Sequence, residues 1–325
     1  MLSDQFAFGM REVLLLSNEI DKTALFKGQF IHGDFSSAQK EYWSTARDRA
    51  GRAYPILFWS EVQKEFFVRN KITRQRKIVI GAPFCHLTKF LSNIGYPAVR
   101  IKRRLLYFPS HSHMGIRLST LNEDLFRSQV KIFRDFGFDP TETTVCLFWL
   151  DYIDPEIRQH YLRLGFEVTC VGYKGNQVQE SPSSDQGGRV TFLLELYDLI
   201  QSHETIITDS LDTSFLYAAL LSKSVIYLSD TLRLRDLNQK DSTQEFNHHS
   251  WNYGNLLHPK TFYSSSDGNH EARDVARQYL GLNYCDSLLF WIKDDKHALK
   301  SKALEGALVE KLEKRIMSIT GSERE

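Results

Sequence analysis

Apolar positions in the second half of the chain occur in short, continuous blocks that are separated by amphipathic segments. The blocks "TTVCLFWL" (143–150), "EVTCVGY" (167–173), "ETIITD" (204–209) and "SVIYLSD" (224–230) are rich in strand-forming residues. Continuous apolar runs of this length are typical of strands that are buried on both faces of a sheet. Because helical patterns lie between them, the region 140–260 is predicted to form a parallel, doubly wound sheet.

The first half also alternates apolar blocks with amphipathic segments, but turn and capping residues mark the ends of its elements less clearly. Strands are predicted within "AYPILFWS" (53–60), "KIVIGAPF" (77–84) and "RRLLYF" (103–108). A capped amphipathic helix is predicted over 122–137, where Gly137 suits a helix end. The C-terminal stretch "KSKALEGALVEKLEKRIMSI" has helical periodicity, and we expect it to pack back onto the preceding structure.

These elements predict an α/β protein with two Rossmann-like domains, whose parallel sheets face each other across a cleft in a GT-B-like manner. A chain of 325 residues is long enough for two domains of ordinary size. The expected division is an N-terminal domain over 1–121, a connecting helix over 122–139, a C-terminal domain over 140–300, and a C-terminal helix and tail over 301–325.

Charge and hydropathy narrow the classes of function. The chain has 41 Lys and Arg against 40 Asp and Glu, so a formal net charge of +1 argues against nucleic acid as a partner. Basic runs at 69–77 and 100–104 fit either a solvated surface or a face toward an anionic acceptor or the inner membrane surface. The N-terminus lacks a signal-peptide pattern and no apolar run reaches transmembrane length, so we expect a cytoplasmic protein, with peripheral membrane contact left open.

The four cysteines are scattered along the chain, at Cys85, Cys146, Cys170 and Cys285. Such spacing is typical of buried free thiols in a reducing compartment, and it matches no zinc-site pattern. Neither a disulfide framework nor a metal site is therefore predicted.

A crowded polar turn opens "TDSLDTSFLYAALLSKSVIYL" (208–228), where a helix is predicted to follow a strand. The turn contains Asp209, Ser210, Thr213 and Ser214. Ligands of parallel sheets bind beyond the carboxyl ends of the strands, and a helix N-terminus carries partial positive charge that attracts phosphate. The turn is therefore a candidate phosphate site, and elaborate helix capping is the alternative.

A second polar cluster follows the last predicted strand, with His258, Lys260, Ser264 and Ser265. Histidine and lysine can neutralise the phosphate of a departing nucleotide, and serine hydroxyls can bind its oxygens. An irregular surface loop is the alternative interpretation.

Four side chains are candidates for acid/base chemistry. His111 and His113 follow the strand predicted over 103–108, and imidazoles exchange protons near neutral pH. Glu61 lies at the end of another predicted strand, where it would face a cleft or cap the next helix. Asp34, in "HGD", has no clear structural setting.

Several motifs are absent. There is no GxGxxG after a strand, no GxxxxGK[ST] and no GxSxG, which argues against a dinucleotide oxidoreductase, a P-loop enzyme and an α/β-hydrolase. No Asp-x-Asp follows a predicted strand to hold a metal–diphosphate complex. We therefore expect nucleotide-sugar chemistry, if present, to be metal-independent and to need no cofactor.

The stretches "FWSEVQKEFF", "KIVIGAPF", "LLYFPSHS" and "ETIITDSLDTSFLYAALLSKSVIYL" together resemble bacterial GT-B glycosyltransferases of capsule and lipopolysaccharide synthesis. The layout is similar to that of CMP-sugar users, the sialyl- and Kdo-transferases. His258-Pro259 followed by Ser264-Ser265 is similar to the His-Pro and Ser-Ser motifs that bind CMP in bacterial sialyltransferases. The segment 208–228 also resembles the CDP-glycerol polymerases of teichoic acid synthesis. The resemblance covers about 50–265, but the acidic motif that carries the sialyltransferase catalytic acid has no clear counterpart.

The resemblance implies a glycosyltransferase that moves a sugar from a nucleotide donor, with a CMP-sugar favoured, to a glycan or lipid-linked glycan of a surface polysaccharide. It implies that the C-terminal domain holds the nucleotide and the N-terminal domain holds the acceptor. His111 or His113 would act as acid/base, with Glu61 and Asp34 as weaker candidates. A CDP-alditol phosphotransferase and a non-catalytic glycan- or nucleotide-binding subunit are the alternatives. A third is a sugar-nucleotide epimerase on the same fold, which would need no acceptor.

Overall fold

The computed structural model describes two compact units, each made of separate stretches of chain. Unit 1 comprises Met1–Ala98, Gly172–Leu196 and Val275–Glu325, and unit 2 comprises Val99–Val171 and Tyr197–Asp274. The described residues are 9–30, 54–70, 75–101, 103–109, 118–119, 130–131, 133–135, 137–171, 191–208, 213–227, 235–236, 268–295, 298–301 and 306–321. Two helices, α8 (Phe192–Gln201) and α10 (Gly268–Leu280), have residues in both units.

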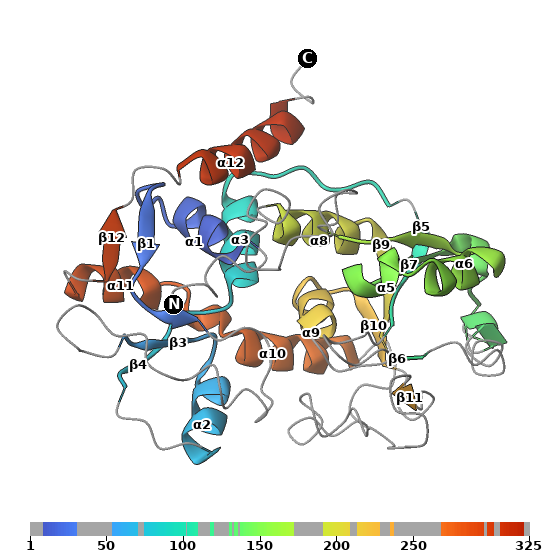
Figure 1. Ribbon diagram of the computed structural model, residues 1–325, viewed down its shortest axis with the longest axis horizontal. Helices are drawn as coiled ribbons and strands as arrows, with labels where there is room; N and C mark the ends of the chain where they lie inside the picture. Colours follow the sequence, from blue (N-terminus) through green and yellow to red (C-terminus); the bar gives the residue numbers. More distant parts are fainter. Residues whose placement is uncertain are drawn as a thin grey trace. The chain divides into compact units, whose positions relative to one another are not determined.

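Unit 1 contains a parallel sheet in the order β2-β3-β4, of which β3 and β4 are labelled in Figure 1. Its strands are β2 (Gln29–Phe30), β3 (Ile56–Phe58) and β4 (Lys77–Val79). Its helical elements are α1 (Met10–Ser17), α2 (Glu61–Asn70), α3 (Pro83–Asn93), the 3-10 turn η7 (Leu282–Tyr284), α11 (Ser287–Asp294) and α12 (Gly306–Gly321). The sheet is thus flanked by helices from both ends of the chain.

Strand β3 is buried on both faces, as its apolar sequence predicts. Leu57 belongs to a core cluster with residues of α1 and β1, whereas Ile56 and Phe58 pack with Val79 in a second cluster. Successive side chains of a strand point to opposite faces, which explains the division. Parallel strands covered on both sides need no polar face.

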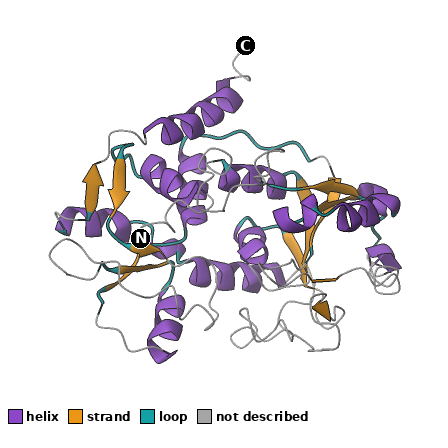
Figure 2. Cartoon of the chain, in the orientation of Figure 1, coloured by secondary structure: helices purple, strands orange, loops and turns teal. Residues whose placement is uncertain are grey.

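The C-terminal part of the chain returns to the N-terminal part. Strand β12 (Leu299–Ser301) pairs antiparallel with β1 (Ala24–Phe26), as Figure 2 shows. Helix α12 packs on α1 and buries Val309 in the same core cluster as Leu14. The predicted return of the C-terminal helix is confirmed.

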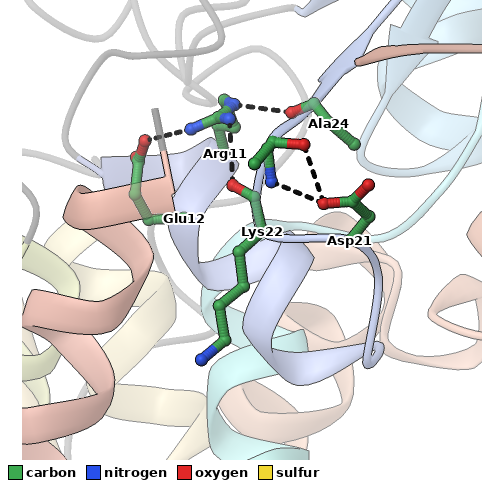
Figure 3. Close-up of polar contacts among 6 residues, drawn as sticks. Arg11, Glu12, Asp21, Lys22 and Ala24 are labelled. Carbon is green, nitrogen blue, oxygen red and sulfur yellow. Dashed lines mark hydrogen bonds and ion pairs between the residues drawn. The ribbon is translucent and has the colours of Figure 1, made fainter. Parts of the chain in front are cut away.

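A buried arginine fixes the start of unit 1 (Figure 3). The guanidinium of Arg11 is fully buried, and its Nη1 lies 2.9 Å from Oε1 of Glu12. Its Nε donates to the Ala24 carbonyl at 2.9 Å and its Nη2 to the Lys22 carbonyl at 3.4 Å. A buried charge is tolerated only when it is paired and hydrogen-bonded. These bonds hold α1 against the segment that leads into β1.

Unit 2 contains a five-stranded sheet in the order β10-β9-β5-β7-β8, and every neighbouring pair is parallel. The strands are β5 (Arg103–Phe108), β7 (Thr143–Cys146), β8 (Glu167–Thr169), β9 (His203–Thr208) and β10 (Ser224–Tyr227). A small antiparallel pair joins β6 (Leu118–Ser119) and β11 (Arg235–Asp236). The other elements are η2 (Pro140–Glu142), α5 (Trp149–Ile153), α6 (Pro155–Arg163) and α9 (Thr213–Leu220).

The core of unit 2 lies on both sides of this sheet. One cluster contains Leu105, Tyr107 and Ile207 from the central strands, together with Phe133 and Tyr161. Their strand neighbours on the opposite face are also buried, namely Leu106, Phe108, Ile206 and Val225. The prediction of an α/β protein with a parallel sheet in each of two units is confirmed.

The units differ from the domain boundaries expected from the sequence. The strand expected to belong to the N-terminal domain, β5, lies between β7 and β9 in the sheet of unit 2. The residues from Val275 onward, expected to belong largely to the C-terminal domain, are part of unit 1. Local apolar patterns identify a strand but not its partners, because pairing depends on the path of the whole chain.

Candidate functional site

The carboxyl edge of the five-stranded sheet contains a topological switch point. From β5 the chain proceeds through β7 to β8 on one side, and it then returns to β9 on the other side of β5. Open α/β sheets bind ligands outside the carboxyl ends of the strands at such a point. The ends of β5 and β9 are therefore the candidate site, which we call the β5–β9 edge.

The two strands end side by side. Phe108 of β5 is the register partner of Thr208 of β9, and both are buried. In sequence, His111 and His113 follow Phe108, while Asp209 and Ser210 follow Thr208. The two polar segments that the sequence singled out thus leave neighbouring strands of one sheet.

Helix α9 starts at the same edge and is unusual in its burial. Every residue from Phe215 to Leu220 is buried, whereas Thr213 and Ser214 are only partly buried. The helix is therefore buried except at its first two residues, Thr213 and Ser214. A helix N-terminus has free N–H groups and partial positive charge, so its exposed end suits an anion.

The neighbouring strand β7 ends in apolar residues. Burial raises the pKa of the Cys146 thiol to about 12, so this thiol is not ionised at neutral pH. Asp154 caps α6 by accepting a hydrogen bond from the Glu156 N–H at 2.9 Å, as its position before Pro155 predicts. Cys146 and Asp154 are thus accounted for by burial and by helix capping.

Of the candidate residues, Thr213 and Ser214 lie where the sequence predicted, in the first turn of the helix that follows β9. The remaining polar candidates lie outside the described residues: Asp34, His111, His113, Asp209, Ser210, His258, Lys260, Ser264 and Ser265. Their roles stay predictions.

Glu61 belongs to unit 1 and begins α2. Its carboxylate lies 2.8 Å from the Nζ of Lys64, and its side chain is 40% exposed. A carboxylate in the first turn of a helix is favoured by the helix dipole. This setting is that of the helix-stabilising alternative, and the acid/base role of Glu61 stays a prediction.

The carboxyl ends of β3 and β4 in unit 1 are covered by another segment of the chain. The Ala82 N–H donates to the Leu280 carbonyl at 2.8 Å, and the Gly81 N–H donates to the Trp59 carbonyl at 3.1 Å. Gly281 lies so close to Trp59 that a Cβ on it would overlap the Trp59 carbonyl oxygen. The segment from Leu280 to Cys285 thus lies against the ends of β3 and β4.

This segment creates a cluster that the sequence did not reveal. It brings Cys285 to Cys85 and His86 in the first turn of α3. No spacing signal could have identified the cluster, because the two cysteines are far apart in the chain and their approach depends on the C-terminal return.

Within the described ranges, no group of three or more His, Cys, Asp or Glu side chains is arranged to hold a metal ion. Each helix in the described part of the chain is too short or too polar to span a bilayer.

No family model and no curated protein matches the chain. Among solved structures, the chain is similar to one titled "S. aureus MnaA-UDP co-structure", at a TM-score of 0.43 and 11% sequence identity. The alignment covers 90% of this chain and 81% of the other. A likeness of this size says nothing about the activity of this chain.

Proposed function

We propose that the protein is a metal-independent glycosyltransferase that binds the phosphate of a nucleotide-sugar donor at the β5–β9 edge. The observation that carries this proposal is the pairing of Phe108 with Thr208 at a topological switch point. It means that the two polar segments identified in the sequence leave adjacent strands of one unit, where they can act on one ligand.

The first residues of α9 would bind the phosphate. Thr213 and Ser214 are the partly exposed residues of an otherwise buried helix, and each has a hydroxyl that can donate to a phosphate oxygen. Asp209 and Ser210 immediately follow β9, and we propose that they contribute to the same donor site. Stabilising the charge on the departing phosphate would supply much of the rate enhancement.

His111 and His113 would serve as acid/base groups. The first of them follows Phe108, the last residue of β5, by three residues in the sequence. With both segments in unit 2, the donor site and the acid/base group need only this one unit. The stretch Tyr197–Asp274 of unit 2, which contains the turn before α9, also contains His258, Lys260, Ser264 and Ser265. We propose that these four residues bind the nucleotide phosphate.

The proposed donor is a CMP-linked sugar, and the proposed acceptor is a glycan or lipid-linked glycan of a surface polysaccharide. The donor follows from the similarity of His258-Pro259 and Ser264-Ser265 to the CMP-binding motifs of sialyltransferases. The acceptor follows from the joint resemblance of the quoted stretches to bacterial transferases of capsule and lipopolysaccharide synthesis. A cytoplasmic enzyme that meets its lipid-linked acceptor at the inner membrane surface is consistent with the basic runs at 69–77 and 100–104.

The test is thermal stabilisation of the full chain by CMP, CDP, UDP, GDP and their common sugar conjugates. A ligand that binds only the folded state stabilises it by about 2.7 kcal/mol at 100 times its dissociation constant. We expect one nucleotide, with CMP favoured, to raise the midpoint temperature of unfolding selectively. If none of them shifts the midpoint, the donor site at the β5–β9 edge is wrong.

Turnover then separates the alternatives. A glycosyltransferase releases the free nucleotide and leaves no phosphate in the product, whereas a CDP-alditol phosphotransferase releases CMP and leaves a phosphodiester. A non-catalytic binding subunit would show the thermal shift but no release of nucleotide with any acceptor. Assaying phosphorus in the product therefore decides between the two enzymatic functions.

A further inference from the structure

Two thiols meet in the interior of unit 1. Cys85 lies in the first turn of α3 and Cys285 follows η7, and both are buried. The Cys85 thiol lies beside the sulfur of Cys285, and it donates its hydrogen bond to the Leu280 carbonyl. Both are free cysteines, so the contact is between reduced thiols.

Backbone contacts fix this approach. The Cys85 N–H donates to the Ala82 carbonyl at 2.9 Å, and the Ala82 N–H donates to the Leu280 carbonyl at 2.8 Å. The Cys85 Sγ lies 3.6 Å from the same Leu280 carbonyl. On the other side, Gly81 has no side chain, and a Cβ there would lie only 2.9 Å from the Cys285 Sγ. The thiol pair therefore depends on a glycine and on the turn that follows α10.

The two sulfurs have different environments. The pKa of Cys285 is lowered mainly by the neighbouring Cys85 thiol and further by the positive charge of Lys89, against the effect of burial. The pKa of Cys85 is raised well above its usual range, mainly by burial. Cys285 is thus the more acidic thiol of the pair and Cys85 the less acidic one, so Cys285 is the one that forms a thiolate more readily.

The pair lies close to the surface. Lys89, one turn after Cys85, forms an ion pair with Asp286, the residue after Cys285, at 2.9 Å. The side chains of Lys89 and Asp286 are 49% and 73% exposed. Solvent therefore reaches Lys89 and Asp286, whereas both thiols are buried, so an oxidant reaches the Cys285 sulfur through a local opening of this region.

We propose that Cys85 and Cys285 form a redox-active dithiol that closes to a disulfide on reaction with a peroxide. The Cys285 thiolate attacks one oxygen of hydrogen peroxide, the O–O bond breaks, and after uptake of one proton the products are a sulfenic acid and water. The Cys85 thiol then attacks the sulfenic sulfur, loses its proton, and displaces the hydroxyl as a second water. The two thiols are oxidised by two electrons, and the peroxide is reduced by the same two.

The disulfide would cross-link α3 to the turn after α10 and would tie the C-terminal return to the sheet of unit 1. This inference depends on unit 1 alone and is independent of the proposed function. A cross-link that closes a long loop removes freedom from the unfolded chain, so the oxidised protein should melt at a higher temperature. A dithiol reductant should reverse the shift.

The experiment treats the folded full chain with hydrogen peroxide, blocks the remaining thiols, and maps the peptides by mass spectrometry. We expect one disulfide between the peptides of Cys85 and Cys285, with a loss of about 2 Da relative to the reduced chain. The variant Cys85→Ser should stop at a sulfenic acid on Cys285, about 16 Da heavier and trapped by dimedone. The variant Cys285→Ser should form neither product at the same peroxide concentration.

The controls are the two other cysteines and the unfolded chain. Cys146→Ser and Cys170→Ser should leave the cross-link unchanged, and peroxide treatment in denaturant should give mixed pairings. The proposal is overturned if Cys85 and Cys285 remain alkylatable in the treated folded protein, or if Cys146 or Cys170 replaces either of them in the disulfide. The wild-type peptide map decides this even if a variant fails to fold.

Discussion

Phe108 and Thr208 occupy the same register in adjacent parallel strands, although the segments that end with them are far apart in the sequence. Each is the last residue of its strand, and each is followed by one of the polar segments that the sequence marks as a candidate site. Their pairing changes the expected arrangement, in which the histidines lay in one domain and the phosphate-binding turn in the other. Both segments follow strands of unit 2, so donor binding can be tested at one sheet edge.

The first prediction concerns the phosphate-binding end of α9. Thr213→Val and Ser214→Ala remove hydroxyl donors from the partly exposed first turn while leaving the buried residues 215–220 intact. We expect each to weaken nucleotide binding about ten- to a hundredfold, because a hydrogen bond to a charged group is worth about 1.5–3 kcal/mol. Titration calorimetry with the nucleotide found in the thermal screen measures this change.

Ser222→Ala is the matched control, since Ser222 is an exposed serine at the other end of the same helix. It should bind the nucleotide like the wild type. Equal affinities of the Thr213 and Ser214 variants and this control would remove the α9 N-terminus from the proposed site and leave helix capping as the role of the polar turn.

The second prediction concerns Gly281, which has a φ of 67° and lies against the backbone of Trp59. Gly281→Ala introduces a Cβ that overlaps the Trp59 carbonyl oxygen, so the turn after α10 must move away from β3. We expect a loss of more than about 4 kcal/mol in the free energy of unfolding, measured by urea denaturation.

Gly95→Ala separates this overlap from backbone strain. Gly95 has a similar φ of 65°, but a Cβ there would meet nothing within 4 Å. Only the cost of the left-handed conformation remains, about 1–2 kcal/mol. If the two variants lose equal stability, the close contact with Trp59 is not what requires glycine at position 281.

The third prediction concerns the end of α9. Ser222 has a φ of 60° and terminates the helix, with its N–H donating to the Ala219 carbonyl and the Lys223 N–H donating to the Ala218 carbonyl. A left-handed residue at this position is usually glycine. Ser222→Gly should therefore raise the free energy of unfolding by about 0.5–1 kcal/mol, after the entropy gained by the unfolded chain is subtracted.

The gain depends on relief of backbone strain, so Ser222→Ala should show none of it. Thermal melts of the two variants side by side provide the measurement. A Ser222→Gly variant no more stable than Ser222→Ala would mean that the serine is not strained in this turn.

These elements show what local sequence can and cannot predict. The segments of β5, β9 and α9 were each predicted with the correct type, because apolar runs and helix-start signals are local. The position of β5 beside β9 was not predicted, since strand pairing is decided by the chain as a whole. For the same reason the polar turn before α9 could be identified as a candidate site, whereas the approach of Cys285 to Cys85 could not.

The last prediction concerns the acid stability of unit 2. Asp139 accepts hydrogen bonds from the Thr141 N–H at 2.9 Å and from its hydroxyl at 2.7 Å, and these bonds hold the pKa of the carboxyl below its ordinary value of 3.8. The unfolded chain therefore takes up a proton more readily than the folded one. The stabilisation by Asp139 is present above the unfolded pKa and is lost as the pH falls through the lower folded pKa.

Asp139→Asn keeps an acceptor at the start of η2 but removes the titration. Urea denaturation between about pH 2 and pH 6 should give a shallower fall in stability on the acid side for this variant than for the wild type. Thr141→Val keeps the hydrogen bond from its N–H to Asp139 and loses only the bond from the hydroxyl. Its loss of stability at low pH should therefore lie between that of the wild type and that of Asp139→Asn. An acid limb of Asp139→Asn that coincides with that of the wild type would show that Asp139 titrates alike in the folded and unfolded chains, and that the hydrogen bonds to Thr141 do not contribute to acid stability.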